Sequence, residues 1–276
     1  MPGIEQDSLL FLAMQTALMA GDAILHHYQS KNLRVGIKRD FSPVTIADCE
    51  ANEIISGQLA VTGFPILSEE GTQFDYSLRK HWNIFWLIDP LDGTKEFLKR
   101  NDEFTVNIAL IRDNLPALGV VYAPALDKMY YADSIHESLH VHASGIKELK
   151  TNSLDGVIDI SEKLPFKSNH HTYTVVASRS HRNFETRKQI KILKREHGDV
   201  NVISSGSSLK FCLVAEGAAD IYPRFGPTME WDTAAGQAVA VFSGCSVTRH
   251  DTGQGLAYNK KNLKNPWFVV KRIQQG

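Results

Sequence analysis

Acidic residues gather around a hexapeptide that directly follows an apolar run. Residues 84–88 read IFWLI, and residues 89–94 read DPLDGT. An unbroken run of bulky apolar residues predicts a strand that is buried on both faces. Asp89 and Asp92, where this strand is expected to end, are costly to desolvate unless a cation meets them. Carboxylates beside a turn whose backbone N–H groups can face an anion indicate metal-assisted phosphoryl chemistry.

Two other segments can add acids to the same site. Glu69 follows a short predicted strand over residues 65–67, and Asp232 lies near the start of a predicted helix over residues 231–242. Together with the carbonyl oxygen of Leu91, these hard donors suit one or two magnesium ions. The set contains no His or Cys, which argues against zinc. Taken alone, Glu69 can be a solvated surface acid and Asp232 a helix cap.

The residues around this acid set can supply the rest of a phosphatase site. Two ions about 3.5–4 Å apart can activate a water molecule and stabilise the leaving oxygen. Gly93 permits close approach of the backbone to a phosphate, and the Thr94 hydroxyl can align the water. Asp48 lies in the first turn of a helix that Thr45 opens, where an acid is also favoured simply by the helix dipole.

The elements that must position these residues follow from apolar periodicity. In the first half, two helical patterns precede a meander, so we expect helices packed on an antiparallel sheet. A weakly patterned stretch near residues 145–169 is the best boundary, which gives domains 1–150 and 151–276. Beyond it, strands and helices alternate in an α/β pattern. The predicted meander strands are 104–111, 118–122, 129–132 and 138–142, and the later elements are strands 173–177, 200–203, 220–222 and 267–270 with helices 184–194, 207–218 and 231–242.

Composition narrows the function classes. The chain has 276 residues and a net charge of −1, so no overall basic field favours a nucleic acid polymer or an anionic membrane. The apolar segment 9–25 is interrupted by polar residues and lacks a basic leader, so neither a signal peptide nor a membrane span is predicted. Three widely spaced cysteines, Cys49, Cys212 and Cys245, are expected to be buried, reduced thiols in a reducing cytosol.

Three ordered motifs make the chain resemble the inositol monophosphatase superfamily. They are the Glu69-Glu70 pair, the hexapeptide 89–94, and residues 231–236, which read WDTAAG. The resemblance covers roughly residues 7–270 and implies magnesium-dependent, lithium-sensitive phosphatases with a layered αβαβα sandwich. It places metal ligands at Glu69, Asp89, Leu91 (through its carbonyl), Asp92 and Asp232, the phosphate at Gly93 and Thr94, and the alignment of water at Thr94 and Glu69.

A second set of residues points to one branch of this superfamily. Residues 206–212 and 222–228, together with Lys95-Glu96-Phe97, resemble the CysQ-type branch, the 3′(2′),5′-bisphosphate nucleotidases. This implies that Ser207, Lys210 and Arg224 bind a nucleotide, with Asp232 beside them. A bisphosphate carries a second anionic group, which the two cations can neutralise. Without the resemblance, Lys210 and Arg224 would be interpreted as ordinary surface residues. The branch also adds Asp48 as an acid that binds a further ion or activates water.

The function implied is hydrolysis of adenosine 3′,5′-bisphosphate (PAP) to AMP and phosphate with two or three magnesium ions. The setting implied is removal of a by-product of sulfate assimilation. The alternatives are an inositol or other sugar phosphatase and, from another class, a noncatalytic nucleotide- or metal-binding protein. We expect a cytoplasmic monomer or homodimer without an integral membrane segment, although some bacterial relatives are loosely membrane-associated.

Overall fold

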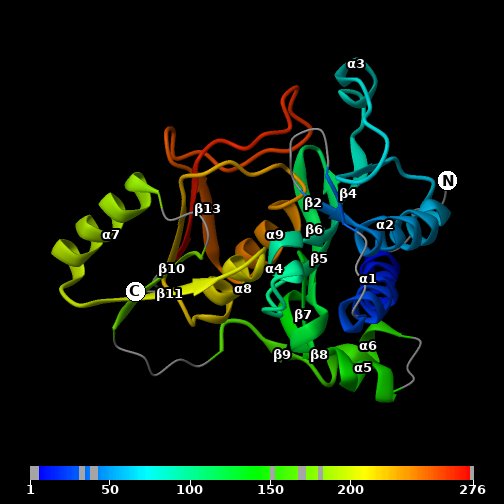
Figure 1. The fold of residues 1–276 in the computed structure, drawn as a ribbon, viewed down its shortest axis with the longest axis horizontal. Helices are drawn as coiled ribbons and strands as arrows, with labels where there is room; N and C mark the ends of the chain where they lie inside the picture. The colour runs from blue at the N-terminus through cyan, green and yellow to red at the C-terminus, as the bar shows by residue number, and fades with distance from the viewer. Residues whose placement is uncertain are drawn as a thin grey trace.

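The layers of the fold alternate between helices and sheets. The computed structural model describes residues 6–30, 35–37, 43–149, 153–166, 172–179 and 183–273. Two sheets lie between three helical layers, which confirms the expected αβαβα sandwich (Figure 1). The outer helices α1 and α2 cover one sheet, α8 and α9 lie between the sheets, and α7 covers the other. These helices are α1 Gln6–Gln29, α2 Ile46–Leu59, α7 Phe184–His197, α8 Leu209–Glu216 and α9 Ala234–Phe242.

The first sheet contains the predicted meander. Its seven strands lie in the order β3-β4-β5-β6-β7-β8-β9. Only the β3–β4 pair is parallel, and the other five pairs are antiparallel. The strands are β3 Ile66–Ser68, β4 Ile84–Asp92, β5 Thr105–Arg112, β6 Leu115–Ala123, β7 Lys128–Asp133, β8 Glu137–His142 and β9 Glu162–Lys163.

The second sheet comes from the later part of the chain. Its strands lie in the order β11-β10-β12-β14-β13. The first three are parallel, as the α/β alternation predicts, whereas β12, β14 and β13 pair antiparallel. The strands are β10 Tyr173–Ser178, β11 Val200–Ser205, β12 Ile221–Arg224, β13 Cys245–Arg249 and β14 Phe268–Arg272.

Short elements connect the layers. Strands β1 and β2 form a two-stranded antiparallel sheet immediately before α2. Helix α6 and strand β9 follow residue 150. Helix α6 nevertheless packs on the hydrophobic core between α1, α2 and the first sheet, and β9 pairs with β8. The division into domains 1–150 and 151–276 stays a prediction. The short elements are β1 Val35–Ile37, β2 Pro43–Thr45, η1 Ala60–Thr62, α3 Tyr76–Arg79, α4 Thr94–Leu98, η2 Pro124–Leu126, α5 Ala143–Leu149 and α6 Leu154–Ile158.

Close packing of α9 brings the later half of the chain onto the first sheet. A Cβ atom added at Gly119 of β6 would lie 2.7 Å from the carbonyl oxygen of Ala235 and from Cβ of Ala238. Small residues on both elements therefore allow the helix backbone to approach the sheet. Because Asp232 lies two residues before α9, this contact also brings a distant acid toward the strand ends.

Helix α1 is long and apolar enough to cross a membrane by length and composition alone, but ten of its residues are buried inside the fold. This matches the apolar face of a core helix. Cys212 and Cys245 are buried free thiols as expected, whereas Cys49 is exposed, so that part of the prediction is wrong. Cys49 lies on the outer side of α2, away from the buried Ala47, Ala51 and Ile55.

Candidate active site

A bulge in β4 places its two aspartates on one face of the sheet. The strand includes both aspartates and ends at Asp92, where the sequence predicts its end. Asp89 pairs with Asn107 and Asp92 with Thr105, so β4 has one more residue than β5 over this interval. Directly opposed residues share a face, and the extra residue changes the alternation. Pro90, which has no N–H to donate, lies within the irregular interval.

Three carboxylates from distant segments converge beside this bulge. One oxygen each of Glu69, Asp89 and Asp232 lies within 4.8 Å of the other two. Glu69 follows β3 directly, and its backbone N–H donates to the Ile88 carbonyl (3.3 Å), which fixes it beside β4. Asp89 is only 2% exposed. An all-oxygen donor set of this charge fits magnesium.

Asp92 lies beside this group and is held by two side chains that the sequence analysis did not single out. Ser208 Oγ donates to Asp92 Oδ2 (3.0 Å), and Asn107 Nδ2 lies 3.4 Å from the same oxygen. Desolvation raises the pKa of Asp92, and the charge of Glu69 adds to this, while Lys210 and the Ser208 hydroxyl oppose it. Clustered acids of this kind are the electrostatic signature of a cation site.

Asp232 is not a simple helix cap. Helix α9 begins later than predicted, at Ala234, and its N-cap residue is Thr233. The Asp232 carboxylate instead accepts the backbone N–H of Met229 (2.9 Å). Desolvation raises the pKa of Asp232 well above its ordinary value, followed by the charges of Asp92 and Glu69. A divalent cation among these acids would offset that repulsion.

The residues expected to hold phosphate and water lie at the end of β4. Gly93 is the N-cap of α4 and has φ of 96°, which a residue with a side chain rarely adopts. Thr94 Oγ1 donates to Asp48 Oδ1 (3.2 Å). Asp48 also completes a capping box with Thr45, so the helix-start interpretation and the active-site interpretation of Asp48 both have contacts in the structure.

One cavity joins the acids to the predicted nucleotide-binding residues. It has a volume of about 110 Å³. Asp92 and Asp232 line it, as do Ser207, Lys210 and Arg224, which come from a segment more than one hundred residues after the hexapeptide. The structure therefore brings the two sets together. The lining residues with direct bearing on charge and shape are Asp92, Gly93, Glu96, Ser178, Ser207, Lys210, Tyr222, Arg224, Thr228 and Asp232.

The two cations of the cavity differ in their surroundings. Lys210 is only 5% exposed, donates to the carbonyl of Ser207 and lies over the ring of Tyr222. The pKa of Lys210 is lowered to about 8, chiefly by burial and also by the charge of Arg224, while Asp92, Glu96 and Glu103 oppose this shift. Arg224 donates from Nη2 to the Pro227 carbonyl (2.9 Å), which holds its guanidinium against the loop after β12.

Several cavity residues were missed by sequence reasoning. Ser178 ends β10, and Thr228 lies in the loop after β12. Ser208 and Asn107 are buried polar residues that contact Asp92 rather than the cavity. Serine, threonine and asparagine are common at strand ends and turns, so these residue types do not by themselves indicate a binding site. Ser208 and Thr228 had a sequence cue, since they lie in the segments 206–212 and 222–228 that resemble the nucleotidases.

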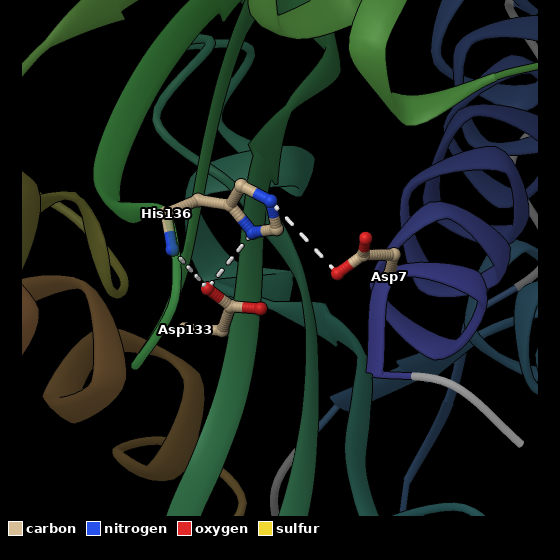
Figure 2. A group of neighbouring side chains, drawn as sticks. All are labelled: Asp7, Asp133 and His136. Carbon is tan, nitrogen blue, oxygen red and sulfur yellow. Dashed lines mark hydrogen bonds and ion pairs between the residues drawn. The ribbon is translucent and has the colours of Figure 1, made fainter.

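A second cluster of possible metal-ligating residues, two aspartates and a histidine, lies away from the cavity at the β7–β8 turn. Asp7 of α1, Asp133 of β7 and His136 of the following turn approach one another (Figure 2). Asp133 Oδ1 accepts the backbone N–H groups of Ile135 (2.9 Å) and His136 (2.7 Å) and lies 3.1 Å from His136 Nδ1. These bonds explain the group as the closure of the β7–β8 turn. None of its three residues lines the cavity above.

The family of the chain follows from comparison with known proteins. The model of the inositol monophosphatase family matches residues 5–268. The chain belongs to the inositol monophosphatase family, whose members are metal-dependent phosphatases. The resemblance drawn from three short motifs is thus confirmed over nearly the whole chain.

Relatives in this family include bacterial proteins of similar length. The 3′(2′),5′-bisphosphate nucleotidase CysQ of Salmonella typhimurium is 46% identical over 261 residues, which is 93% of this chain and 96% of the relative. CysQ of Haemophilus influenzae is 34% identical over 270 residues, covering 96% and 93%. The crystal structure of CysQ from Bacteroides thetaiotaomicron has a TM-score of 0.90 at 46% identity, covering 98% of this chain and 99% of that chain.

Proposed function

We propose that this protein hydrolyses the 3′-phosphate of adenosine 3′,5′-bisphosphate to give AMP and phosphate. One observation carries the proposal: a single cavity is lined at once by Asp92 and Asp232 of the acid cluster and by the cations Lys210 and Arg224. A substrate with two phosphates needs both sets. The relatives named as 3′(2′),5′-bisphosphate nucleotidases, at up to 46% identity, support the same substrate.

The acid set is proposed to hold two or three magnesium ions. Glu69, Asp89, Asp92, Asp232 and the carbonyl of Leu91 are the proposed ligands, and Asp48 is a further acid beside them. When bound, magnesium stabilises the negative charge on the phosphoryl oxygens during transfer. The backbone N–H groups of Gly93 and Thr94 at the start of α4 are proposed to donate to the same phosphate.

The Thr94–Asp48 pair gives the site a path for a proton. Thr94 Oγ1 already donates to Asp48 Oδ1, so its lone pair can accept a proton from the attacking water while Asp48 takes the threonine proton. Glu69 is proposed to orient that water as well. The water oxygen bonds to phosphorus as the bond between phosphorus and the 3′-oxygen breaks. The leaving 3′-oxygen takes a proton from solvent water to become the 3′-hydroxyl, and Asp48 returns its proton to the solvent.

Lys210, Arg224 and Ser207 are proposed to select the nucleotide. The 5′-phosphate would lie at the cationic side of the cavity, beside Lys210 and Arg224. Hydrogen bonds from charged donors to a phosphate are stronger than those from neutral donors. We also propose a cytoplasmic setting, in keeping with the free thiols of Cys212 and Cys245.

A phosphate-release panel with magnesium tests the proposal. The substrates are adenosine 3′,5′-bisphosphate, inositol 1-phosphate, fructose 1,6-bisphosphate and AMP. We expect the bisphosphate nucleotide to have the highest kcat/KM. A preference for inositol 1-phosphate would replace the substrate assignment with an inositol phosphatase, and release that needs neither magnesium nor the acids would remove the catalytic assignment.

A further inference from the structure

The start of β5 carries alternate polar residues that face one turn of the later chain. Thr105 and Asn107 of β5 are two residues apart, so their side chains share one side of the strand, and Glu103 lies two residues before Thr105, just outside β5. Glu103 Oε2 accepts the backbone N–H of Gly206 (2.9 Å), and Thr105 Oγ1 lies 3.2 Å from Ser207 Oγ. We call this set, with Asn107 and Ser208, the polar clamp.

Asn107 and Ser208 connect the polar clamp to the acidic residues Asp92 and Asp232. Asn107 Nδ2 donates to Ser208 Oγ (3.0 Å), and both residues are nearly inaccessible, at 1% and 2% exposed. Ser208 Oγ in turn lies 3.0 Å from Asp92 Oδ2 and 2.8 Å from the backbone carbonyl of Asp232. The Ser208 hydroxyl has one proton to donate, and it lies within hydrogen-bond distance of a carboxylate oxygen at the end of β4 and of the backbone carbonyl of the other acid.

The geometry has a specific consequence for the spacing of the acids. Asp92 and Asp232 belong to segments that the sequence separates widely, and like charges repel in a desolvated site. A buried hydroxyl that Asn107 holds between the two segments places its proton among their oxygens and so offsets part of that repulsion before any cation arrives. Partners that hold ligating carboxylates in this way set their orientation and the affinity for the ion.

We propose that Ser208, supported by Asn107, is a positioning residue that fixes Asp92 relative to Asp232 and so sets the metal affinity of the site. The proposal rests on the proposed function, in which these acids are metal ligands. It assigns Ser208 a role distinct from its neighbour Ser207, which faces the cavity.

The test measures magnesium binding directly. Isothermal titration calorimetry of substrate-free protein would compare wild type with Ser208→Ala, Ser208→Thr and Ser208→Cys. We expect Ser208→Ala to weaken magnesium binding by about 10–100-fold, the range for loss of a partner to a ligand. Ser208→Thr restores the hydroxyl and should recover most of the affinity. Ser208→Cys keeps a similar volume with a weak donor, so it should weaken binding even if Ser208→Ala does not fold.

A matched control separates positioning from packing. Ser138 of β8 is also a buried serine, 0% exposed, and its hydroxyl has no hydrogen-bond partner among the described residues. Ser138→Ala should leave the magnesium dissociation constant unchanged. Thermal melting in EDTA reports folding of every variant without the metal.

Two results would overturn the positioning role of Ser208. A magnesium dissociation constant in Ser208→Ala within about 2-fold of wild type would overturn the positioning role, as would wild-type protein that binds no magnesium. The substrate panel is read separately. If the protein binds magnesium but does not release phosphate from the bisphosphate nucleotide, the proposed function fails while the binding comparison still decides the role of Ser208.

Discussion

The acid side and the cation side of the cavity are built in different ways. Most proposed metal ligands lie at the ends of β3 and β4, where strand pairing and the β4 bulge fix the backbone. The proposed nucleotide residues lie on α8 and at the end of β12, in the other half of the chain. Of the proposed metal ligands, Asp232 alone comes from that half, and the Ser208 hydroxyl lies 2.8 Å from its backbone carbonyl oxygen.

This difference separates chemistry from selectivity. Substitutions on the acid side should lower turnover for every phosphate ester, because every substrate needs the same metal-holding groups. Substitutions on the cation side should lower the rate chiefly for substrates that carry a second phosphate. Four experiments test this division between the acid side and the cation side.

Removing two acid charges should have the largest effect. Asp92→Asn with Asp232→Asn keeps side-chain size but removes two carboxylates, and we expect kcat to fall by about 10³-fold or more. Phosphate release with saturating magnesium measures the loss, with circular dichroism to confirm folding. Equal rates in the double variant and wild type would contradict the assignment of the acid side.

Removing a cation should have a smaller, substrate-dependent effect. Lys210→Ala or Arg224→Ala loses charged hydrogen bonds worth about 1.5–3 kcal/mol, which corresponds to about 10–150-fold in kcat/KM for the bisphosphate. Adenosine 3′-phosphate, which lacks the 5′-phosphate, is the matched substrate and should lose much less. Equal losses of kcat/KM on both substrates would show that the cation side does not select for the second phosphate.

Magnesium should stabilise the folded protein, and more so as pH rises. At 100 times its dissociation constant, a ligand adds about 2.7 kcal/mol to the free energy of unfolding. The pKa values of Asp92 and Asp232 are raised, so the metal-free native state holds more protons than the unfolded state above about pH 3.8. Its stability therefore falls as pH rises toward the raised native values.

Bound magnesium replaces those protons and should remove this loss. Thermal melting in EDTA and in magnesium, from about pH 5 to about pH 7, gives both curves. A gain from magnesium that is constant across this range would argue against a repelling acid cluster. The double asparagine variant is the control, since it should show almost no gain.

The smallest effect concerns the charge of Lys210. Because its pKa is about 8, with Asp92, Arg224, Glu96 and Glu103 nearby, Lys210 loses its proton as pH rises through that value. We expect kcat/KM for the bisphosphate to fall by up to about ten-fold at pH 9, with a shallower fall for adenosine 3′-phosphate. Lys210→Arg stays charged and should flatten the difference. Identical profiles for both substrates would rule out this role for Lys210.

Local patterns were enough to predict most elements. The four meander strands, the parallel strands of the second sheet and the main helices all form close to where apolar periodicity places them. The start of α9 was misplaced, and the bulge in β4 was not predicted. At both points a functional segment departs from a regular pattern, through the β4 bulge and through the turn that Asp232 and Met229 close.

The sequence by itself determined the chemistry that the chain can support: hard oxygen donors at strand ends, a glycine where the backbone must turn, and the order of three motifs. These properties are local, since residue type and near neighbours decide them. Tertiary structure alone decided that Lys210 and Arg224 share a cavity with Asp92, and that Ser208 bridges Asp92 to the Asp232 segment. Those contacts join residues far apart in the chain, so they depend on how α8 and α9 pack between the two sheets.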